Sequence, residues 1–185
     1  MMHYGSKLTS MQACKQVHSM KNKYLWLSAI TASVIALDQL TKYLVVQRFR
    51  LHESARIIPG FFDLTYVRNP GAAFGFLAGA QGMWRTVFFI TVSIIALAVI
   101  TVLVRQTRDR LSLIALALIG GGAVGNLIDR VRFGEVVDFI DWYYRTFHWP
   151  TFNIADSAIS LGVGLLAIEM LFVKKQEEQK PEISN

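Results

Sequence analysis

Residues 86–104 read TVFFITVSIIALAVITVLV and residues 111–128 read LSLIALALIGGGAVGNLI, and neither stretch contains a charged residue. The two stretches are 19 and 18 residues long. A helix needs about 20 predominantly apolar residues to cross the hydrocarbon core of a bilayer, which is about 30 Å thick. A soluble domain rarely carries two uncharged runs of this length, so the sequence predicts two membrane-spanning helices here.

Two further apolar runs, at about residues 24–46 and 154–173, are of similar length but contain a few charged residues. The whole chain of 185 residues is 53% hydrophobic and 17% charged, whereas a soluble domain is about 25% charged. These features predict an all-α membrane protein with four transmembrane helices in one domain, residues 24–173. The first run is too long for a cleavable signal peptide and lacks a small-residue cleavage pattern, so we interpret it as a retained helix.

The basic residues lie between the apolar runs and indicate the orientation of the chain. Residues 1–23 are polar and basic, and we expect a flexible tail there, with a second polar tail at residues 174–185. If both tails are cytoplasmic, the cytoplasmic segments hold 10 Lys and Arg residues in 41 positions and the outer segments hold 7 in 61. Cytoplasmic segments are enriched in Lys and Arg, so both termini are predicted in the cytoplasm. The basic residues form no stripe with interleaved aromatics, so nucleic acid is not an expected partner.

The two outer segments, residues 47–83 and 129–152, carry features beyond those of plain linkers. Apolar and polar residues alternate from Phe62 to Val67, which predicts a short strand, and Asn69-Pro70-Gly71 predicts a turn. We therefore expect a small β-rich segment on the outer membrane surface. The second segment holds an aromatic cluster that suits either a belt at the level of the lipid headgroups or local packing under a loop, formed by Trp142, Tyr143, Tyr144 and Trp149.

Polar residues within the apolar runs are expensive to place in a membrane, so each of them requires an explanation. Asp38 and Lys42 are four residues apart and share a helix face. They either form an ion pair that lets the helix insert or support a polar site on its outer side. Gly122, Asn126 and Arg130 also fall on one helix stripe. Arg130 can reach for the membrane surface, but with Asn126 one turn deeper we expect it to clamp a substrate oxygen.

Asp138 and Asp156 flank one short outer segment and are the candidate catalytic residues. Asp138 has apolar neighbours on both sides, which is unusual for a solvated loop carboxylate. Asp156 has a structural alternative, because Asn153 is a good helix N-cap and Asp156 would then lie at the third helical position. Two carboxyl groups that share a site do not both ionise easily, so one keeps a proton near neutral pH. Such a pair can activate a water molecule and protonate a peptide carbonyl.

Other chemistries find little support in the sequence. The four histidines are scattered without metal-ligand spacing, the single cysteine cannot form a cluster, and no serine-nucleophile motif is present. We therefore expect neither a metal ion nor another cofactor. Two alternatives to a peptidase stay open: a proton-coupled carrier that uses the intramembrane Asp and Arg residues, and a structural membrane protein in which all these charges form ion pairs.

Five short segments, taken in order, resemble the signature blocks of the lipoprotein signal peptidase (signal peptidase II) family. They are Asp38-Gln39-Leu40-Thr41-Lys42, Asn69-Pro70-Gly71-Ala72-Ala73-Phe74-Gly75, Gly122 through Arg130, Val136-Val137-Asp138-Phe139 and Phe152-Asn153-Ile154-Ala155-Asp156-Ser157. With the four apolar runs, the resemblance covers residues 24–173. Five blocks in the same order are far more specific than any single motif.

The resemblance implies an aspartyl endopeptidase of the bacterial inner membrane that cuts prolipoproteins on the amino side of a diacylglyceryl-modified cysteine. It implies Asp138 and Asp156 as the catalytic pair, at the outer face of the membrane. The residues that would shape the site or bind the substrate are Asp38, Lys42, Asn69, Gly122, Asn126, Arg130 and Asn153. Membrane lipid, prolipoprotein substrates and the inhibitor globomycin are the implied partners, and a monomer is expected.

Overall fold

Four long helices form the body of the molecule in the computed structural model, which describes the backbone at residues 4–71 and 83–178 and side chains at residues 23–71 and 83–171. The helices are α1 (Tyr4–Arg48), α2 (Met83–Gln106), α3 (Arg110–Phe133) and α4 (Ile154–Glu178). In this part of the chain, four helical stretches are long and apolar enough to cross a membrane: Lys23–Arg48, Met83–Gln106, Arg110–Phe133 and Ile154–Leu171. The prediction of four membrane-spanning helices is confirmed.

The α1 helix is longer than its membrane-spanning part, because its backbone is helical from Tyr4 onward. The segment predicted as a flexible tail, residues 1–23, thus largely continues this helix. The division of the chain into a basic tail, a domain at residues 24–173 and a polar tail at residues 174–185 stays a prediction.

Helix α3 is the centre of the bundle and contacts each of the other three helices. It begins after Asp109, whose side chain accepts a hydrogen bond from the backbone N–H of Ser112, and it ends at Gly134. Gly134 has a φ of 77°, a conformation that glycine adopts without steric cost, and it donates its N–H to the carbonyl of Arg130. Helix α2 packs mainly against α3 and has no buried residue. This is expected for a helix that is largely surrounded by lipid.

Three glycines of α3 allow its neighbours to approach closely, as the small-residue pattern predicts. A Cβ atom at Gly121 would lie 2.8 Å from Val34 of α1, and one at Gly125 would lie 2.5 Å from the carboxylate of Asp38. Gly122 faces the other way, and a Cβ there would lie 2.4 Å from the carbonyl oxygen of Ala155 in α4. Gly122 therefore contributes to the site by helix packing.

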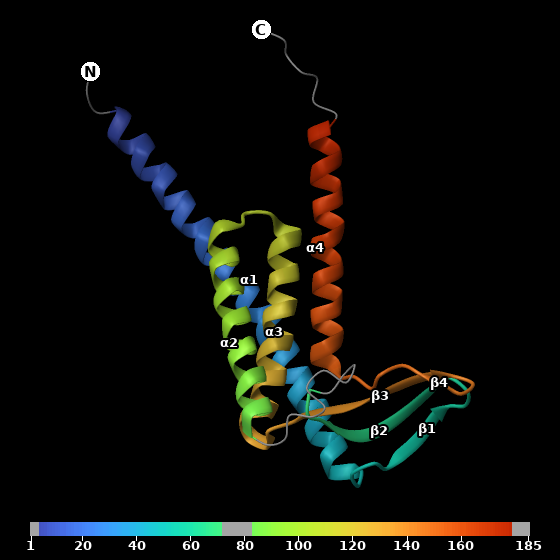
Figure 1. The fold of residues 1–185 in the computed structure, drawn as a ribbon. Coiled ribbons are helices and arrows are strands. Elements are labelled where there is room, and N and C mark those ends of the chain that lie inside the picture. Colours follow the sequence, from blue (N-terminus) through green and yellow to red (C-terminus); the bar gives the residue numbers. More distant parts are fainter. Residues whose placement is uncertain (1–3, 72–82, 179–185) are drawn as a thin grey trace.

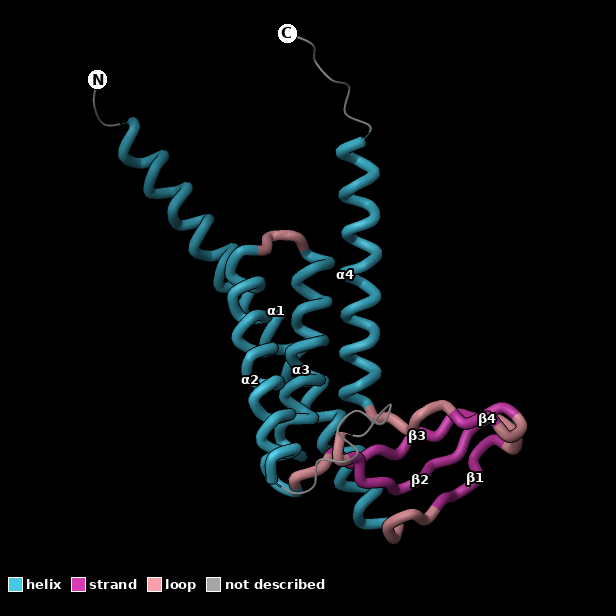
Figure 2. The backbone as a smooth tube through the Cα atoms, in the orientation of Figure 1, coloured by secondary structure: helices cyan, strands magenta, loops and turns pink. Residues whose placement is uncertain are grey.

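A four-stranded antiparallel sheet in the order β1-β2-β3-β4 lies at one end of the helices and projects to the side (Figure 1). The strands are β1 (Ser54–Ile58), β2 (Phe62–Asn69), β3 (Val136–Tyr144) and β4 (Phe147–His148). The beginning of α1, the connection between α2 and α3 and the end of α4 lie at the opposite end (Figure 2). The alternation at residues 62–67 correctly predicted β2, and the predicted β-rich segment is confirmed. The turn at Asn69-Pro70-Gly71 is also present, since Gly71 donates its N–H to the side chain of Asn69.

The sheet is anchored to the helices at its inner end. Val137 and Phe139 of β3 and Tyr66 of β2 form a buried cluster with Val45, near the end of α1. This cluster holds the strand that carries Asp138 against the bundle. The distal end of the sheet extends away from the helices (Figure 1).

We expect Gly122→Ala to destabilise the protein, because the added methyl group would push against the backbone of α4. Overpacking of this kind costs about 1–3 kcal/mol, which would appear as a lower thermal unfolding temperature in detergent. Gly164→Ala is the matched control, since a Cβ at Gly164 meets no atom within 4 Å. Equal unfolding temperatures for the two variants would contradict the close α3–α4 contact.

Candidate active site

Asp138 lies where β3 passes the beginning of α4, and its side chain is only 1% exposed. Its Oδ1 accepts a hydrogen bond of 2.6 Å from the side-chain amide of Asn153, and its Oδ2 accepts one of 2.8 Å from Asn69. Both carboxylate oxygens are therefore held by asparagine amide groups, one from the residue before α4 and one from the end of β2. This fixes the carboxyl group in a single orientation.

Asp156 is held at the N-terminus of α4 by a reciprocal cap. The side chain of Asn153 accepts a hydrogen bond from the N–H of Asp156, and Asp156 Oδ2 accepts one of 3.2 Å from the N–H of Asn153. The capping interpretation of Asp156 is therefore correct. The cap involves only Oδ2 of Asp156. The other oxygen, Oδ1, accepts a hydrogen bond of 2.7 Å from the side chain of Asn126.

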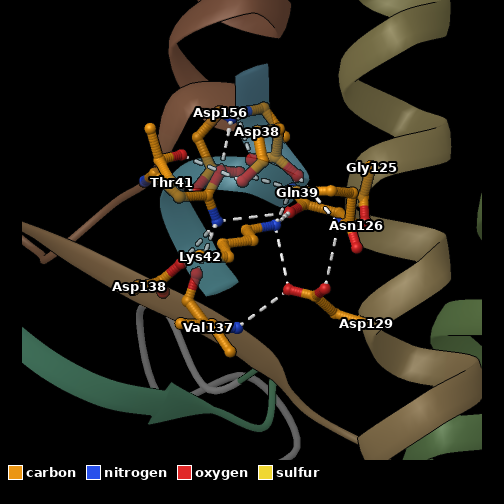
Figure 3. Close-up of polar contacts among 12 residues, drawn as sticks. Asp38, Gln39, Thr41, Lys42, Gly125, Asn126, Asp129, Val137, Asp138 and Asp156 are labelled. Atoms are coloured by element: carbon orange, nitrogen blue, oxygen red, sulfur yellow. Dashed lines mark hydrogen bonds and ion pairs between the residues drawn. The ribbon is translucent and has the colours of Figure 1, made fainter. Parts of the chain in front are cut away.

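Asn153 and Asn126 connect the two carboxyl groups, and Figure 3 shows Asn126, Asp138 and Asp156 around Lys42. Asn153 contacts Asp138 through its side chain and Asp156 through its backbone. Its amide group also lies 3.2 Å from the side-chain oxygen of Asn126. Burial, reinforced by the negative charge of Asp156, raises the pKa of Asp138 to about 7. Asp138 and Asp156 thus belong to one hydrogen-bonded network, and the raised pKa lets Asp138 keep its proton to higher pH than an ordinary aspartate.

The buried side chain of Lys42 holds several members of this network in place. The Lys42 ammonium group is 2.8 Å from Asp38, 2.9 Å from Asp129 and 2.9 Å from the side-chain oxygen of Asn126. Its three N–H groups therefore have three acceptors. Because Lys42 occupies the oxygen of Asn126, the amide nitrogen of Asn126 must be the atom that faces Asp156. The ion pair predicted between Asp38 and Lys42 is present, and it also supports the site.

Asp129 and Gln39 belong to this network, although neither was among the site residues predicted from the sequence. Asp129 Oδ2 accepts a hydrogen bond of 3.1 Å from the N–H of Val137, the residue before Asp138. Gln39 donates to Asp129 at 3.1 Å and to the carbonyl of Gly125 at 3.1 Å. The only sign of Asp129 in the sequence is an acidic residue at the end of an apolar run, which does not reveal its partners.

Asp38 of α1 also contacts helix α4. Its Oδ1 accepts a hydrogen bond of 2.9 Å from the N–H of Ala155 in the first turn of α4. This N–H has no partner within the helix, so the carboxylate satisfies it and interacts favourably with the positive end of the helix. Asp38 therefore ties α1 to α4.

Arg130 lies beside these groups but makes no ion pair among the side chains that the structure describes. Its guanidinium group donates to the carbonyl of Asn126 at 3.3 Å and lies 5.2 Å from the centre of the Phe89 ring. The predicted substrate clamp at Arg130 stays a prediction. Of the second signature block, Ala72-Ala73-Phe74-Gly75 lies outside the described residues.

The family model described as signal peptidase (SPase) II matches residues 30–172, which include every residue of the network described above. The chain belongs to the signal peptidase II family.

Relatives within the signal peptidase II family match over most of their length. The lipoprotein signal peptidase of Syntrophus aciditrophicus is 52% identical over 160 residues, which cover 85% of this chain and 98% of that protein. The lipoprotein signal peptidase of Geobacter sulfurreducens is 50% identical over 163 residues, covering 87% and 99% of the two chains. A bacterial membrane enzyme solved by the in meso method at 2.3 Å resolution shares the fold with a TM-score of 0.73 at 36% identity, over 86% of this chain and 94% of that one. Membership of this family, together with the four helices, makes the chain a multi-pass membrane protein.

We expect Asp129→Ala to destabilise this signal peptidase II family member strongly, because it leaves the buried Lys42 ammonium group with one carboxylate fewer. Removing one partner of a buried ion pair costs about 3–5 kcal/mol, which thermal unfolding in detergent would measure. Glu135→Ala breaks the more exposed contact with Arg85, at 4.0 Å, and should cost at most about 1 kcal/mol. A loss for Asp129→Ala as small as that for Glu135→Ala would show that the network contributes little stability.

Proposed function

We propose that the protein is an intramembrane aspartyl endopeptidase that removes the signal peptide from bacterial prolipoproteins, cutting on the amino side of the diacylglyceryl-modified cysteine. Membership of the signal peptidase II family supports the substrate class. The observation that carries the catalytic assignment is the pair formed by Asp138 and Asp156, whose carboxyl groups are both held by Asn153.

The two carboxyl groups have different surroundings and take different roles in this proposal. Asp156 lies at the positive end of α4 and accepts hydrogen bonds from Asn126 and Asn153, and in this proposal it acts as the base. It removes a proton from a water molecule, and the resulting hydroxide attacks the peptide carbonyl carbon. Asp138 holds a proton and gives it to the carbonyl oxygen. The tetrahedral intermediate then collapses: the C–N bond breaks, the leaving nitrogen receives the proton that Asp156 took from water, and a hydroxyl group returns a proton to Asp138 as the carbonyl re-forms.

The location of the site supports the same proposal. The carboxyl pair lies at the end of the bundle that carries the sheet, opposite the connection between α2 and α3 (Figures 1 and 2). The distribution of Lys and Arg favours that connection and both termini in the cytoplasm. The pair then lies at the outer face, where a diacylglyceryl anchor in the outer leaflet would hold its substrate. A scissile bond at the interface is also free of the helix hydrogen bonds that protect a membrane-buried peptide bond.

We expect Asp138→Asn and Asp156→Asn each to lower cleavage of a lipidated prolipoprotein in detergent by at least about a hundredfold, since each removes a proton-transfer group. The fold should persist, because the amide keeps the shape of the carboxyl group and one of its two acceptor oxygens. Asp141→Asn is the matched control: Asp141 lies three residues along β3 and binds His148 instead of the pair. More than a tenth of the normal rate in either active-site variant would rule out the pair mechanism.

The same assay distinguishes the alternatives. A proton carrier or a structural protein would cleave nothing, even as the unaltered chain. A strong chelator should leave the cleavage rate unchanged if the carboxyl pair alone supplies the chemistry, and a loss of activity would point to a metal ion.

We expect kcat/KM to fall as the pH rises through about 7. The pKa of Asp138 is raised to about 7, so its proton is present below this pH and lost above it, and with it the acid that protonates the carbonyl oxygen. A pH profile measured with a substrate that has no titrating group in this range tests this. A rate that keeps increasing to pH 9 would contradict the role of Asp138 as the acid.

A further inference from the structure

The half-buried ring of Phe89 extends from helix α2 toward the active site. One turn earlier on the same helix face, the hydroxyl group of Thr86 donates a hydrogen bond of 3.1 Å to the carbonyl oxygen of Gly134. This bond fixes the rotation of α2 beside the end of α3, at the end of the bundle that carries the sheet (Figure 1). Phe89 is thereby turned inward, whereas the ring of its neighbour Phe88 is 42% exposed.

The ring of Phe89 contacts the guanidinium group of Arg130. The guanidinium carbon lies 5.2 Å from the centre of the ring, which is within the range of a cation–π interaction. The group also donates a hydrogen bond of 3.3 Å to the carbonyl of Asn126, and its charge acts on the carboxyl groups of Asp156 and Asp138. An arginine side chain near the membrane surface is long enough to turn toward water. The ring therefore favours the position in which Arg130 stays beside the carboxyl pair.

The same ring contacts the turn that follows β2. Gly71 has a φ of 92°, and a Cβ atom at this position would overlap the ring of Phe89, so the ring lies directly against the backbone of the turn. The N–H of Gly71 donates to Asn69 Oδ1 at 2.8 Å. Because this bond holds the oxygen of the Asn69 amide, the amide nitrogen is the atom that donates to Asp138, also at 2.8 Å.

We propose that Phe89 is a positioning residue of the active site, whose ring holds the guanidinium group of Arg130 and, through Gly71, the amide group of Asn69 toward the carboxyl pair. Phe89 itself does not take part in proton transfer. One ring supports both the cation that would bind a substrate oxygen and the amide that orients the acid. This inference rests on the proposed function, because it gives Phe89 a part in that reaction.

Replacing Phe89 with pentafluorophenylalanine tests the contact with Arg130. Fluorination keeps the ring close to its original size but reverses the charge of its face, so attraction of the cation becomes repulsion. A cation–π interaction is worth a factor of about 2 to about 30 in an equilibrium constant. We therefore expect KM for a lipidated prolipoprotein to increase several-fold, with kcat and the thermal unfolding temperature in detergent nearly unchanged. The same replacement at the exposed Phe88 is the matched control and should leave KM unchanged.

The variant Phe89→Ala tests the contact with Gly71. It empties the space beside the turn, so the Asn69 amide loses its fixed orientation. The bond from Asn69 favours the charged form of Asp138 and opposes the increase in its pKa. Weakening this bond raises the pKa of Asp138 further, so its proton is retained to higher pH. We expect the fall of kcat/KM with rising pH to move upward by about half a pH unit or more, since a hydrogen bond to a charged group is worth at least that much.

Phe89→Leu is the matched control for the pH profile. Leucine fills much of the space beside Gly71 but has no aromatic face, so it releases Arg130 and still supports the turn. Its pH profile should stay close to that of the unaltered chain. The charged groups that face Asp138 are the same in both variants, namely Asp156 of α4, Lys42 of α1 and Arg130 of α3. If Phe89→Ala does not fold in detergent, Phe89→Val takes its place, because its short side chain also leaves the turn without support.

Three results would overturn the inference. A KM unchanged by pentafluorophenylalanine at position 89 would show that the ring does not position Arg130. Coincident pH profiles for Phe89→Ala and Phe89→Leu, with only the unfolding temperature reduced, would show that the ring merely packs between the helix and the turn. If the unaltered chain cleaves no prolipoprotein, the proposed function fails and this inference with it, whereas normal cleavage with either of the first two results removes the positioning role alone.

Discussion

The rest of this structure depends on the pairing of the buried Lys42 ammonium group with its oxygen partners. A charged amine in a membrane protein is tolerated only when it is fully paired, and Lys42 meets three oxygen atoms from Asp38, Asp129 and Asn126. Each partner then binds a different element. Asp38 accepts from the first turn of α4, Asp129 accepts from the backbone of β3, and Asn126 donates to Asp156. One buried cation thus joins α1, α3, α4 and β3.

The arrangement also determines the orientation of groups that could otherwise turn. An asparagine amide presents either its oxygen or its nitrogen to a neighbour. Lys42 holds the oxygen of Asn126, so the nitrogen faces Asp156, and the nitrogen of Asn153 faces Asp138. Among the described residues, every buried side-chain nitrogen or oxygen has a hydrogen-bond partner. Rotating any one of these groups would leave a buried polar atom unpaired, so the network is fixed as a unit.

Particular residues show which features could be predicted from the sequence. The membrane spans were predictable because their length is set by the bilayer, and β2 was predictable because its apolar residues Phe62, Leu64 and Tyr66 recur at every second position. Strand β3 was not predictable in this way. Its first four residues, Val136 to Phe139, are all buried, so apolar and polar residues do not alternate there. The roles of Asp129 and Gln39 depend on contacts with residues eight to ninety positions away, which local pattern does not contain. The shared helix stripe of Gly122, Asn126 and Arg130 follows from their spacing, but the packing of Gly122 on α4 depends on a tertiary contact that the spacing does not contain.

Asp156 caps α4 and is also the base in the proposed mechanism, and this combination follows from where a carboxylate can be stabilised in a membrane protein. The first turn of a helix offers free N–H groups and a positive potential, so it is one of the few places at the edge of a bilayer where a carboxylate is stabilised without a dedicated cation. Asp138, in contrast, sits on a buried strand where neutral amides are its partners, and its carboxyl group keeps a proton to higher pH. Two chemically identical side chains are made different by their elements, one helical and one extended. The proposed mechanism needs a base and an acid at the same bond, and under that proposal the junction of β3 with α4 supplies both, while Lys42 compensates the carboxylates of Asp38 and Asp129.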